Sequence, residues 1–288
     1  MQIQPALVKE LRERTGVGMM DCKKALVETG GDIDAAADHL RKAGQAKADK
    51  KASRVAAEGR IVIATDPNGR HALVEVNSET DFVANDENFQ GFAETVASAV
   101  LSTDARDVES LLATAAEGGT IEELRKALVA KVGENITVRR FQVVDGGDNV
   151  GSYIHMNRIG VIVEAQGGDE QMVRDLAMQV AATSPKFVSV DDVPADELEG
   201  EREILKAQAA QEGKPPEIVE KMVEGRLRKH FDEVTLLGQP FVKNPDQRVR
   251  DLLKASNAKV SRFVRFEVGE GVEKSESNFA DEVKDLLD

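Results

Sequence analysis

Residues 60–77, RIVIATDPNGRHALVEVN, show most directly how the middle of this 288-residue chain folds. Two runs rich in apolar side chains, 60–65 and 71–77, flank the sequence DPNG. Pro67 presets one backbone dihedral angle and Gly69 readily adopts a positive φ, so this sequence is typical of a tight turn. The stretch therefore predicts a β-hairpin.

The residues after the hairpin change to a helical apolar pattern. Apolar residues between 89 and 100 recur at helical spacing, and further helices are expected at 108–116 and 121–132, before a strand at 136–144. An antiparallel sheet with helices on one face would bury such elements. We therefore expect an α+β subdomain over 60–145.

A second set of residues repeats this plan later in the chain. HALVEV at 71–76 resembles GVIVEA at 160–165, and RFQV at 140–143 resembles RFEV at 265–268. Helical positions recur as well: Phe92, Ala93, Val96 and Ala97 match Leu176, Ala177, Val180 and Ala181. These matches predict a duplicated core, with its second copy over 146–277.

The two copies differ in two places. The offset between matching residues falls from 89 in the hairpin to 84 in the helix, so the first copy carries about five extra residues at 78–85. The offset then rises to 125, which assigns about 41 extra residues to the second copy. Narrow apolar stripes on both sides of the sequence GKPP predict a helical hairpin inserted over 190–231. A short amphipathic helix is expected at 278–288.

Residues 1–45 are expected to form a small bundle of three short helices. The first begins at Pro5, and glycine-containing breaks separate it from the second and the second from the third. Asp32 caps the third helix, which is expected to end at Gly44. Residues 46–59 are rich in Ala and Lys without a clear apolar stripe, and we expect them to form a linker, for which an irregular and a partly helical conformation both stay open.

Composition narrows the classes of function. Acidic residues outnumber basic ones by 52 to 38, for a net charge of −14, which argues against direct binding of nucleic acid or of an anionic membrane. The single cysteine, Cys22, excludes an intramolecular disulfide and a multi-cysteine metal site. Neither a membrane-spanning apolar run nor a signal peptide is found, so we expect a cytoplasmic protein.

Signatures of catalysis are missing from the sequence. It contains none of the common motifs for phosphate binding, dinucleotide binding, zinc hydrolysis or a serine nucleophile. The four histidines lie far apart, without the spacing of metal ligands. A reactive thiol and a buried bundle cysteine both suit Cys22, and the second is the simpler interpretation. We therefore expect no enzymatic activity, no cofactor and no metal site.

The extra loop contains the sequence TDFV at 80–83, in which apolar residues stand next to a carboxylate. In one interpretation Phe82 folds into its own core and Asp81 caps a turn. In the other, Phe82 is a wedge that enters a partner's pocket, beside a carboxylate that disturbs a cation or phosphate site. Met19 and Met20 leave a similar choice between core packing and an adaptable contact surface.

Two long segments resemble signatures of the bacterial elongation factor Ts family. These are LRERTGVGMMDCKKAL at 11–26 and EVNSETDFVAN at 75–85. The similarity extends through GSYIH at 151–155, the Gly-Lys-Pro helical hairpin and residues 263–271, so it covers nearly the whole chain.

The resemblance implies a nucleotide-exchange factor that binds elongation factor Tu in its GDP-bound and nucleotide-free forms. The three N-terminal helices would resemble a ubiquitin-associated domain and dock on the GTPase. The segment that dislodges Mg²⁺ from the partner matches Thr80, Asp81, Phe82 and Val83, with Phe82 as a wedge and Asp81 near the magnesium site. Partner-contacting positions match Arg12, Met19, Met20 and His155.

Two other classes of function stay open on the residues alone. A non-catalytic adaptor would use the three helices to bind a ubiquitin-like or other partner, with the core as a scaffold. An enzyme would use clustered carboxylates or Cys22. The loop at 80–83 separates the adaptor from the exchange factor, because an adaptor needs no wedge beside a nucleotide site.

Overall fold

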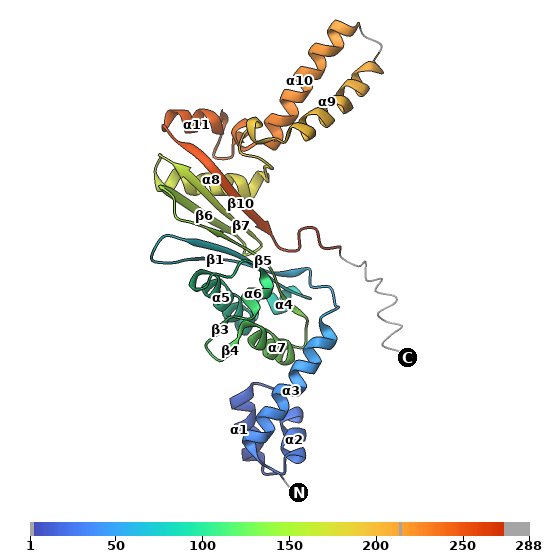
Figure 1. Cartoon of the computed structure of the whole chain (residues 1–288), viewed down its shortest axis with the longest axis vertical. Helices are drawn as coiled ribbons and strands as arrows, with labels where there is room; N and C mark the ends of the chain where they lie inside the picture. Colours follow the sequence, from blue (N-terminus) through green and yellow to red (C-terminus); the bar gives the residue numbers. More distant parts are fainter. Residues whose placement is uncertain (1–2, 213–214, 274–288) are drawn as a thin grey trace. The chain divides into compact units, whose positions relative to one another are not determined.

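The computed structural model describes residues 3–212 and 215–273 (Figure 1). The chain divides into two compact units. Among the described residues, the first unit contains 3–66, 72–143 and 266–273, and the second contains 67–71, 144–212 and 215–265.

The first unit combines helices with one three-stranded sheet. Its helices are α1 (Pro5–Thr15), α2 (Met19–Glu28), α3 (Ile33–Lys51), α4 (Asp81–Ala84), α5 (Glu87–Ser102), α6 (Val108–Leu112) and α7 (Ile121–Val132). Its strands are β1 (Glu58–Thr65), β2 (His71–Ser78), β5 (Ile136–Val144) and the short pair β3 (Ala115–Ala116) and β4 (Gly119–Thr120). The sheet has the order β1-β2-β5.

The second unit is built around the sheet β10-β7-β6. Its strands are β6 (Asn149–His155), β7 (Ile159–Gln166), β10 (Lys259–Glu267) and the short pair β8 (Pro240–Phe241) and β9 (Asn244–Arg248). Its helices are α8 (Glu170–Thr183), α9 (Ala195–Ala210), α10 (Pro216–Val234) and α11 (Val249–Ala255), with 3₁₀ turns η1 (Val190–Asp192) and η2 (Leu236–Gly238). Together the two units confirm the predicted mixture of helix and sheet.

Each sheet buries one face against helices. In the first unit, helices α5 and α7 lie on one side of the sheet (Figure 1), and Phe89 and Val96 of α5 are fully buried in a core shared with Val74 of β2. In the second unit, Leu176 of α8 is fully buried beside Val161 of the antiparallel pair β6–β7. Apolar burial of this kind holds the strands that carry the functional loops.

Helices α1, α2 and α3 share a separate small core that includes Leu11, Cys22 and Leu26. Gly16 ends α1 with a positive φ of 67°, and the carboxylate of Asp32 caps α3 by accepting hydrogen bonds from two backbone N–H groups.

The predicted end of the third helix at Gly44 is wrong, because α3 continues to Lys51 and takes up part of the expected linker. Gly44 is buried where α3 packs on α7, and a Cβ atom there would lie 2.9 Å from the Cβ of Ala130. The glycine therefore permits close approach of two helices and does not stop one. The helix expected over 108–116 is likewise shorter, because residues 115–116 pair with 119–120 across a glycine turn.

Helices α9 and α10 lie side by side (Figure 1) and bury Leu205, Val223 and Phe231 between them. They occupy the region of the predicted helical hairpin. The helix expected at 278–288 lies outside the described residues.

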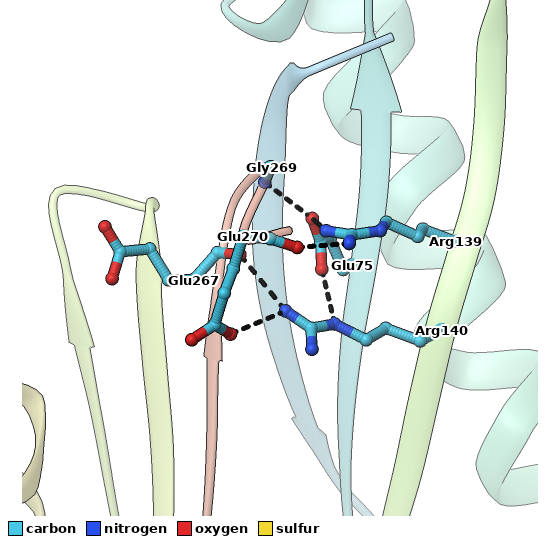
Figure 2. A network of polar contacts seen from close by, with 6 residues as sticks. All are labelled: Glu75, Arg139, Arg140, Glu267, Gly269 and Glu270. Atoms are coloured by element: carbon cyan, nitrogen blue, oxygen red, sulfur yellow. Dashed lines mark hydrogen bonds and ion pairs between the residues drawn. The ribbon is translucent and has the colours of Figure 1, made fainter. Parts of the chain in front are cut away.

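The buried carboxylate of Glu75 on β2 holds residues 267–270 in place within the first unit (Figure 2). It accepts hydrogen bonds from Arg139 Nη1 at 2.9 Å, Arg140 Nε at 2.6 Å and the backbone N–H of Gly269 at 2.8 Å. A buried carboxylate requires such neutralising partners.

The two arginines also bond directly to the fastened segment. Arg140 donates to the carbonyl of Glu267 at 3.1 Å and to the carboxylate of Glu270 at 3.2 Å, and Arg139 donates to the carbonyl of Glu270. The guanidinium of Arg140 additionally lies 4.2 Å from the ring centroid of Phe266. Residues 266–270, which belong to the first unit, are thus joined to β2 and β5 by these contacts.

A candidate protein-binding site at helix α4

Helix α4 is a single turn that follows strand β2 after a two-residue connection. Thr80 caps it: its backbone is extended, with φ −123° and ψ 158°, and its hydroxyl accepts a hydrogen bond from the N–H of Val83 at 3.4 Å. Asn85 ends the turn by donating from its side-chain amide to the carbonyl of Asp81 at 2.9 Å. Local hydrogen bonds at both ends therefore define this short element.

The two faces of α4 differ sharply in burial. Ala84 is buried and Val83 packs against the hydrophobic core of the first unit. Asp81 and Phe82 face solvent, and Phe82 is 84% exposed. The interpretation that Phe82 folds into its own core is therefore wrong.

Exposure of this ring forgoes a large hydrophobic gain. Full burial of a phenylalanine side chain is worth about 1.5–3 kcal/mol. An exposed phenylalanine on an otherwise anchored turn is well suited to enter a pocket on another protein.

Glu134, in the connection between α7 and β5, holds the start of the turn. Its carboxylate accepts two hydrogen bonds from Thr80, one from the backbone N–H at 3.0 Å and one from the hydroxyl at 2.7 Å. No local sequence pattern marks Glu134, because 54 residues separate it from Thr80.

Neighbouring residues extend this support to the end of α3. The carboxylate of Glu79 accepts a hydrogen bond from the backbone N–H of Asn135 at 2.6 Å and lies 3.4 Å from Arg54 Nη1. The side-chain amide of Asn135 donates to the carbonyl of Arg54 at 2.7 Å. Three connections, α3–β1, β2–α4 and α7–β5, therefore meet beside the exposed turn.

Asp86 begins the next helix, α5, immediately after the turn. Its carboxylate accepts hydrogen bonds from the side chain and the backbone N–H of Asn88, both at 2.9 Å, and from the N–H of Phe89 at 3.3 Å. The Asn88 side-chain bond, then the backbone bonds and the charge of Lys131, hold the pKa of Asp86 below its ordinary value. The exposed turn thus lies between two capped helix starts.

Other predicted contact residues lie on separate elements. Met19 and Met20 at the start of α2 are 55% and 64% exposed, so neither belongs to the small core, and Arg12 on α1 is exposed as well. His155 ends β6 in the second unit, where its Nδ1 lies 3.1 Å from the hydroxyl of Tyr153. The structure therefore gathers residues 80–83 on one turn and leaves these four residues elsewhere.

Met156, next to His155, was not singled out by the sequence. It is 78% exposed and adopts a positive φ of 49° at the turn between β6 and β7. Left-handed backbone is uncommon for a methionine, and neither its residue type nor the surrounding pattern predicts it.

The described residues offer no evident metal site. Within 3–212 and 215–273, no group of three or more His, Cys, Asp and Glu side chains is placed to hold a metal ion. Cys22 is buried, and its thiol donates to the carbonyl of Val17 at 3.4 Å.

None of the helices in the described part of the chain is both long and apolar enough to cross a membrane.

Comparison with known proteins places these features in one family. A family model described as "Elongation factor TS" matches residues 79–270. The chain is 62% identical over 284 residues to elongation factor Ts of Halorhodospira halophila, covering 98% of each chain. It is 57% identical over 286 residues to elongation factor Ts of Thioalkalivibrio sulfidiphilus, covering 98% of each, and 55% identical over 283 residues to that of Legionella pneumophila, covering 98% of this chain and 97% of the relative.

Proposed function

This chain belongs to the elongation factor Ts family and is a translation elongation factor, and we propose that it promotes GDP release from elongation factor Tu. It would bind the GDP-bound and the nucleotide-free forms of that GTPase. Nucleotide exchange makes and breaks no covalent bond in this chain, so the function requires no catalytic side chain.

The exposure of Phe82 is the observation that supports this proposal most strongly. Phe82 is 84% exposed, while Val83 and Ala84 anchor the other face of the same turn. A side chain presented in this way can enter a pocket of the partner without any rearrangement of its own support. Preorganisation lowers the cost of ordering that binding otherwise incurs.

Asp81 gives the wedge an electrostatic component. GDP binding in GTPases depends on Mg²⁺ that neutralises the phosphate oxygens. The Phe82 ring would enter between elements of the partner and place the Asp81 carboxylate near the magnesium site. This would weaken the partner's binding of both Mg²⁺ and GDP. By linkage, GDP must then weaken binding of this chain by the same factor.

Separate contacts would hold the partner while the wedge acts. We assign these to Arg12, Met19 and Met20 on α1 and α2, and to His155 on β6. The exposure of Met19, Met20 and His155 supports the assignment. Methionine side chains adapt readily to the shape of a partner.

We also propose a modular origin for this arrangement. Residues 1–45, with α1, α2 and the first part of α3, would be a docking domain that resembles ubiquitin-associated domains. Residues 46–59, which include the end of α3 and the start of β1, would join it to the core. The sheets β1-β2-β5 and β6-β7-β10, each with a helix after its central strand, would be two copies of one ancestral unit over 60–145 and 146–277. The α9–α10 pair would be an insertion over 190–231 in the second copy.

Stopped-flow release of fluorescent GDP from elongation factor Tu tests the function. We expect strong acceleration by the wild-type chain, and about a tenfold loss or more in Phe82→Ala, equivalent to about 1.4 kcal/mol in barrier height. Asp81→Ala is expected to lose most of the acceleration of GDP release when Mg²⁺ is in excess. Ile204→Ala on α9, which shortens another exposed apolar side chain, serves as the matched control.

Three results would contradict parts of this proposal. No acceleration by the wild-type chain would remove the exchange function. Complex formation without acceleration would instead favour a non-catalytic adaptor. Normal rates in Phe82→Ala and Asp81→Ala would keep the function and remove the wedge.

A further inference from the structure

We propose that Glu134 is a positioning residue for the turn α4. It holds Thr80 so that Phe82 and Asp81 project in one fixed direction. The inference rests on the proposed exchange function. It concerns a residue that need not touch the partner and acts through the turn that does.

The contact between Glu134 and Thr80 uses both oxygens of the carboxylate. Oε2 accepts from the backbone N–H of Thr80 at 3.0 Å, and Oε1 accepts from its hydroxyl at 2.7 Å. Hydrogen bonds to an ionised group are shorter and stronger than neutral ones. A paired contact of this kind fixes both the backbone and the side-chain rotamer of Thr80.

That rotamer determines the cap of α4. Because the hydroxyl hydrogen of Thr80 points to Glu134, a lone pair of the same oxygen remains for the N–H of Val83, which lies 3.4 Å away. The carbonyl of Thr80 is occupied as well, since it accepts from the hydroxyl of Ser78 at 2.8 Å. Thr80, two residues before Phe82, is therefore held through its N–H, its carbonyl and its hydroxyl.

The turn needs such external support because it is too short to be stable alone. Helix α4 has four residues, and isolated helices below about 12 residues are marginal in water. Phe82 adds no packing, since it is exposed. The direction of the wedge thus depends on two anchors, the apolar packing of Val83 and Ala84 and the polar contact to Glu134.

The support residue is itself held on both sides. Gly133 ends α7 with a φ of 83°, and its carbonyl accepts a hydrogen bond from Lys51 at the end of α3. Asn135 is fully buried and bonds to Glu79 and to the carbonyl of Arg54. Glu134 therefore transmits a fixed position from α3 and α7 to the wedge.

This arrangement predicts a loss of exchange rate without a matching loss of binding. In Glu134→Gln, the amide nitrogen cannot accept a hydrogen bond, so the amide oxygen is left for the backbone N–H of Thr80 and the bond that the Thr80 hydroxyl donates is lost. We expect the GDP release rate at saturating factor to fall about tenfold, the scale of one charged hydrogen bond. The Kd for nucleotide-free elongation factor Tu should change less than about threefold, because α1, α2 and His155 are untouched.

A double-mutant cycle assigns the effect to the Glu134–Thr80 contact. Thr80→Val removes the same hydroxyl bond from the other side and also the cap to Val83, and Thr80→Ser restores both. We expect Thr80→Ser to accelerate GDP release more than Thr80→Val does, because it regains the hydroxyl. The double variant Thr80→Val/Glu134→Gln should be hardly slower than Thr80→Val alone, because both changes remove one interaction.

Glu117→Gln, an exposed glutamate in the β3–β4 turn, is the matched control. Hydrogen exchange provides a second measurement: in Glu134→Gln, the amides of residues 83–85 should exchange faster while those of β2 stay protected. A structural role confined to overall stability would instead speed exchange across β2 as well.

The outcomes separate this inference from the proposed function. One outcome is that the wild-type chain accelerates GDP release, Phe82→Ala accelerates it less, and Glu134→Gln accelerates it as much as wild type. In that case the positioning role is wrong and the exchange function stands. The positioning role would also be wrong if the rate losses of the two single variants multiplied in the double variant. Equal fold losses of binding affinity and of GDP release rate would overturn it as well. No acceleration by the wild-type chain would remove the function itself.

Discussion

Phe82 and Phe89 show how position decides the role of one residue type. The two rings lie seven residues apart, yet Phe89 is fully buried in the core and Phe82 is 84% exposed. Removing a buried phenylalanine typically costs about 3–5 kcal/mol of stability, whereas exposed positions contribute little. The first ring therefore stabilises the fold, and the second is free for a partner.

Asp86 carries the prediction on pH. Because its folded-state pKa lies below the ordinary value of 3.8, the carboxylate contributes stability above that value and loses it as pH falls toward its lowered pKa. We expect Asp86→Ala to be less stable than wild type by about 0.5–2 kcal/mol at pH 7, the usual cost of a lost cap.

Urea denaturation between pH 7 and pH 3 measures this difference. The gap between wild type and Asp86→Ala should stay constant down to about pH 5 and narrow below about pH 4. Glu87→Ala, which changes the next exposed acidic side chain, is the control. A gap that widens as pH falls would contradict the assigned direction of the pKa shift.

At the scale of elements, glycines and buried charges determine how the helices and strands meet. Gly44 lets α3 pass close to α7, so the helix continues where the sequence pattern suggested an end. Glu75 on β2 has a corresponding role, since its carboxylate binds the N–H of Gly269 and two arginines of β5 within the first unit (Figure 2).

We expect Glu75→Ala to lower the free energy of unfolding by about 3–5 kcal/mol, because it leaves two guanidinium groups beside an apolar core without their buried partner. Glu270→Ala removes an exposed carboxylate from the same network and should cost less than about 1 kcal/mol. Urea denaturation followed by circular dichroism provides both values. Equal effects of the two substitutions would mean that burial of Glu75 is not what stabilises the segment.

The whole molecule presents its proposed contacts on two units. Met20 lies on α2 in the first unit, and His155 lies on β6 in the second. Two contact regions on one chain raise affinity through effective concentration even when each is weak.

We therefore expect Met20→Ala and His155→Ala to weaken binding of elongation factor Tu independently. Their free-energy changes should add to within about 0.5 kcal/mol in the double variant. Titration calorimetry on the four proteins of the cycle gives this comparison. A strongly non-additive double variant would show that the two regions respond to one shared rearrangement.

The sequence by itself determined the features that depend on nearby residues. The turn at 66–69 and the helix cap at Asp32 arise from interactions within a few positions, and the structure places them where the local pattern predicts. The segments 11–26 and 75–85 also pointed to the family, which the relatives then showed.

Only the tertiary structure decided the features that depend on distant residues. It placed Phe82 in solvent rather than in the core, kept α3 helical through Gly44, and brought Glu134 to Thr80 across 54 residues. Local sequence patterns reflect the conformational preferences of neighbouring residues, whereas burial and long-range hydrogen bonds form only when the chain folds. The candidate site therefore divides in the same way: its residues 80–83 are visible in the sequence, and their support is not.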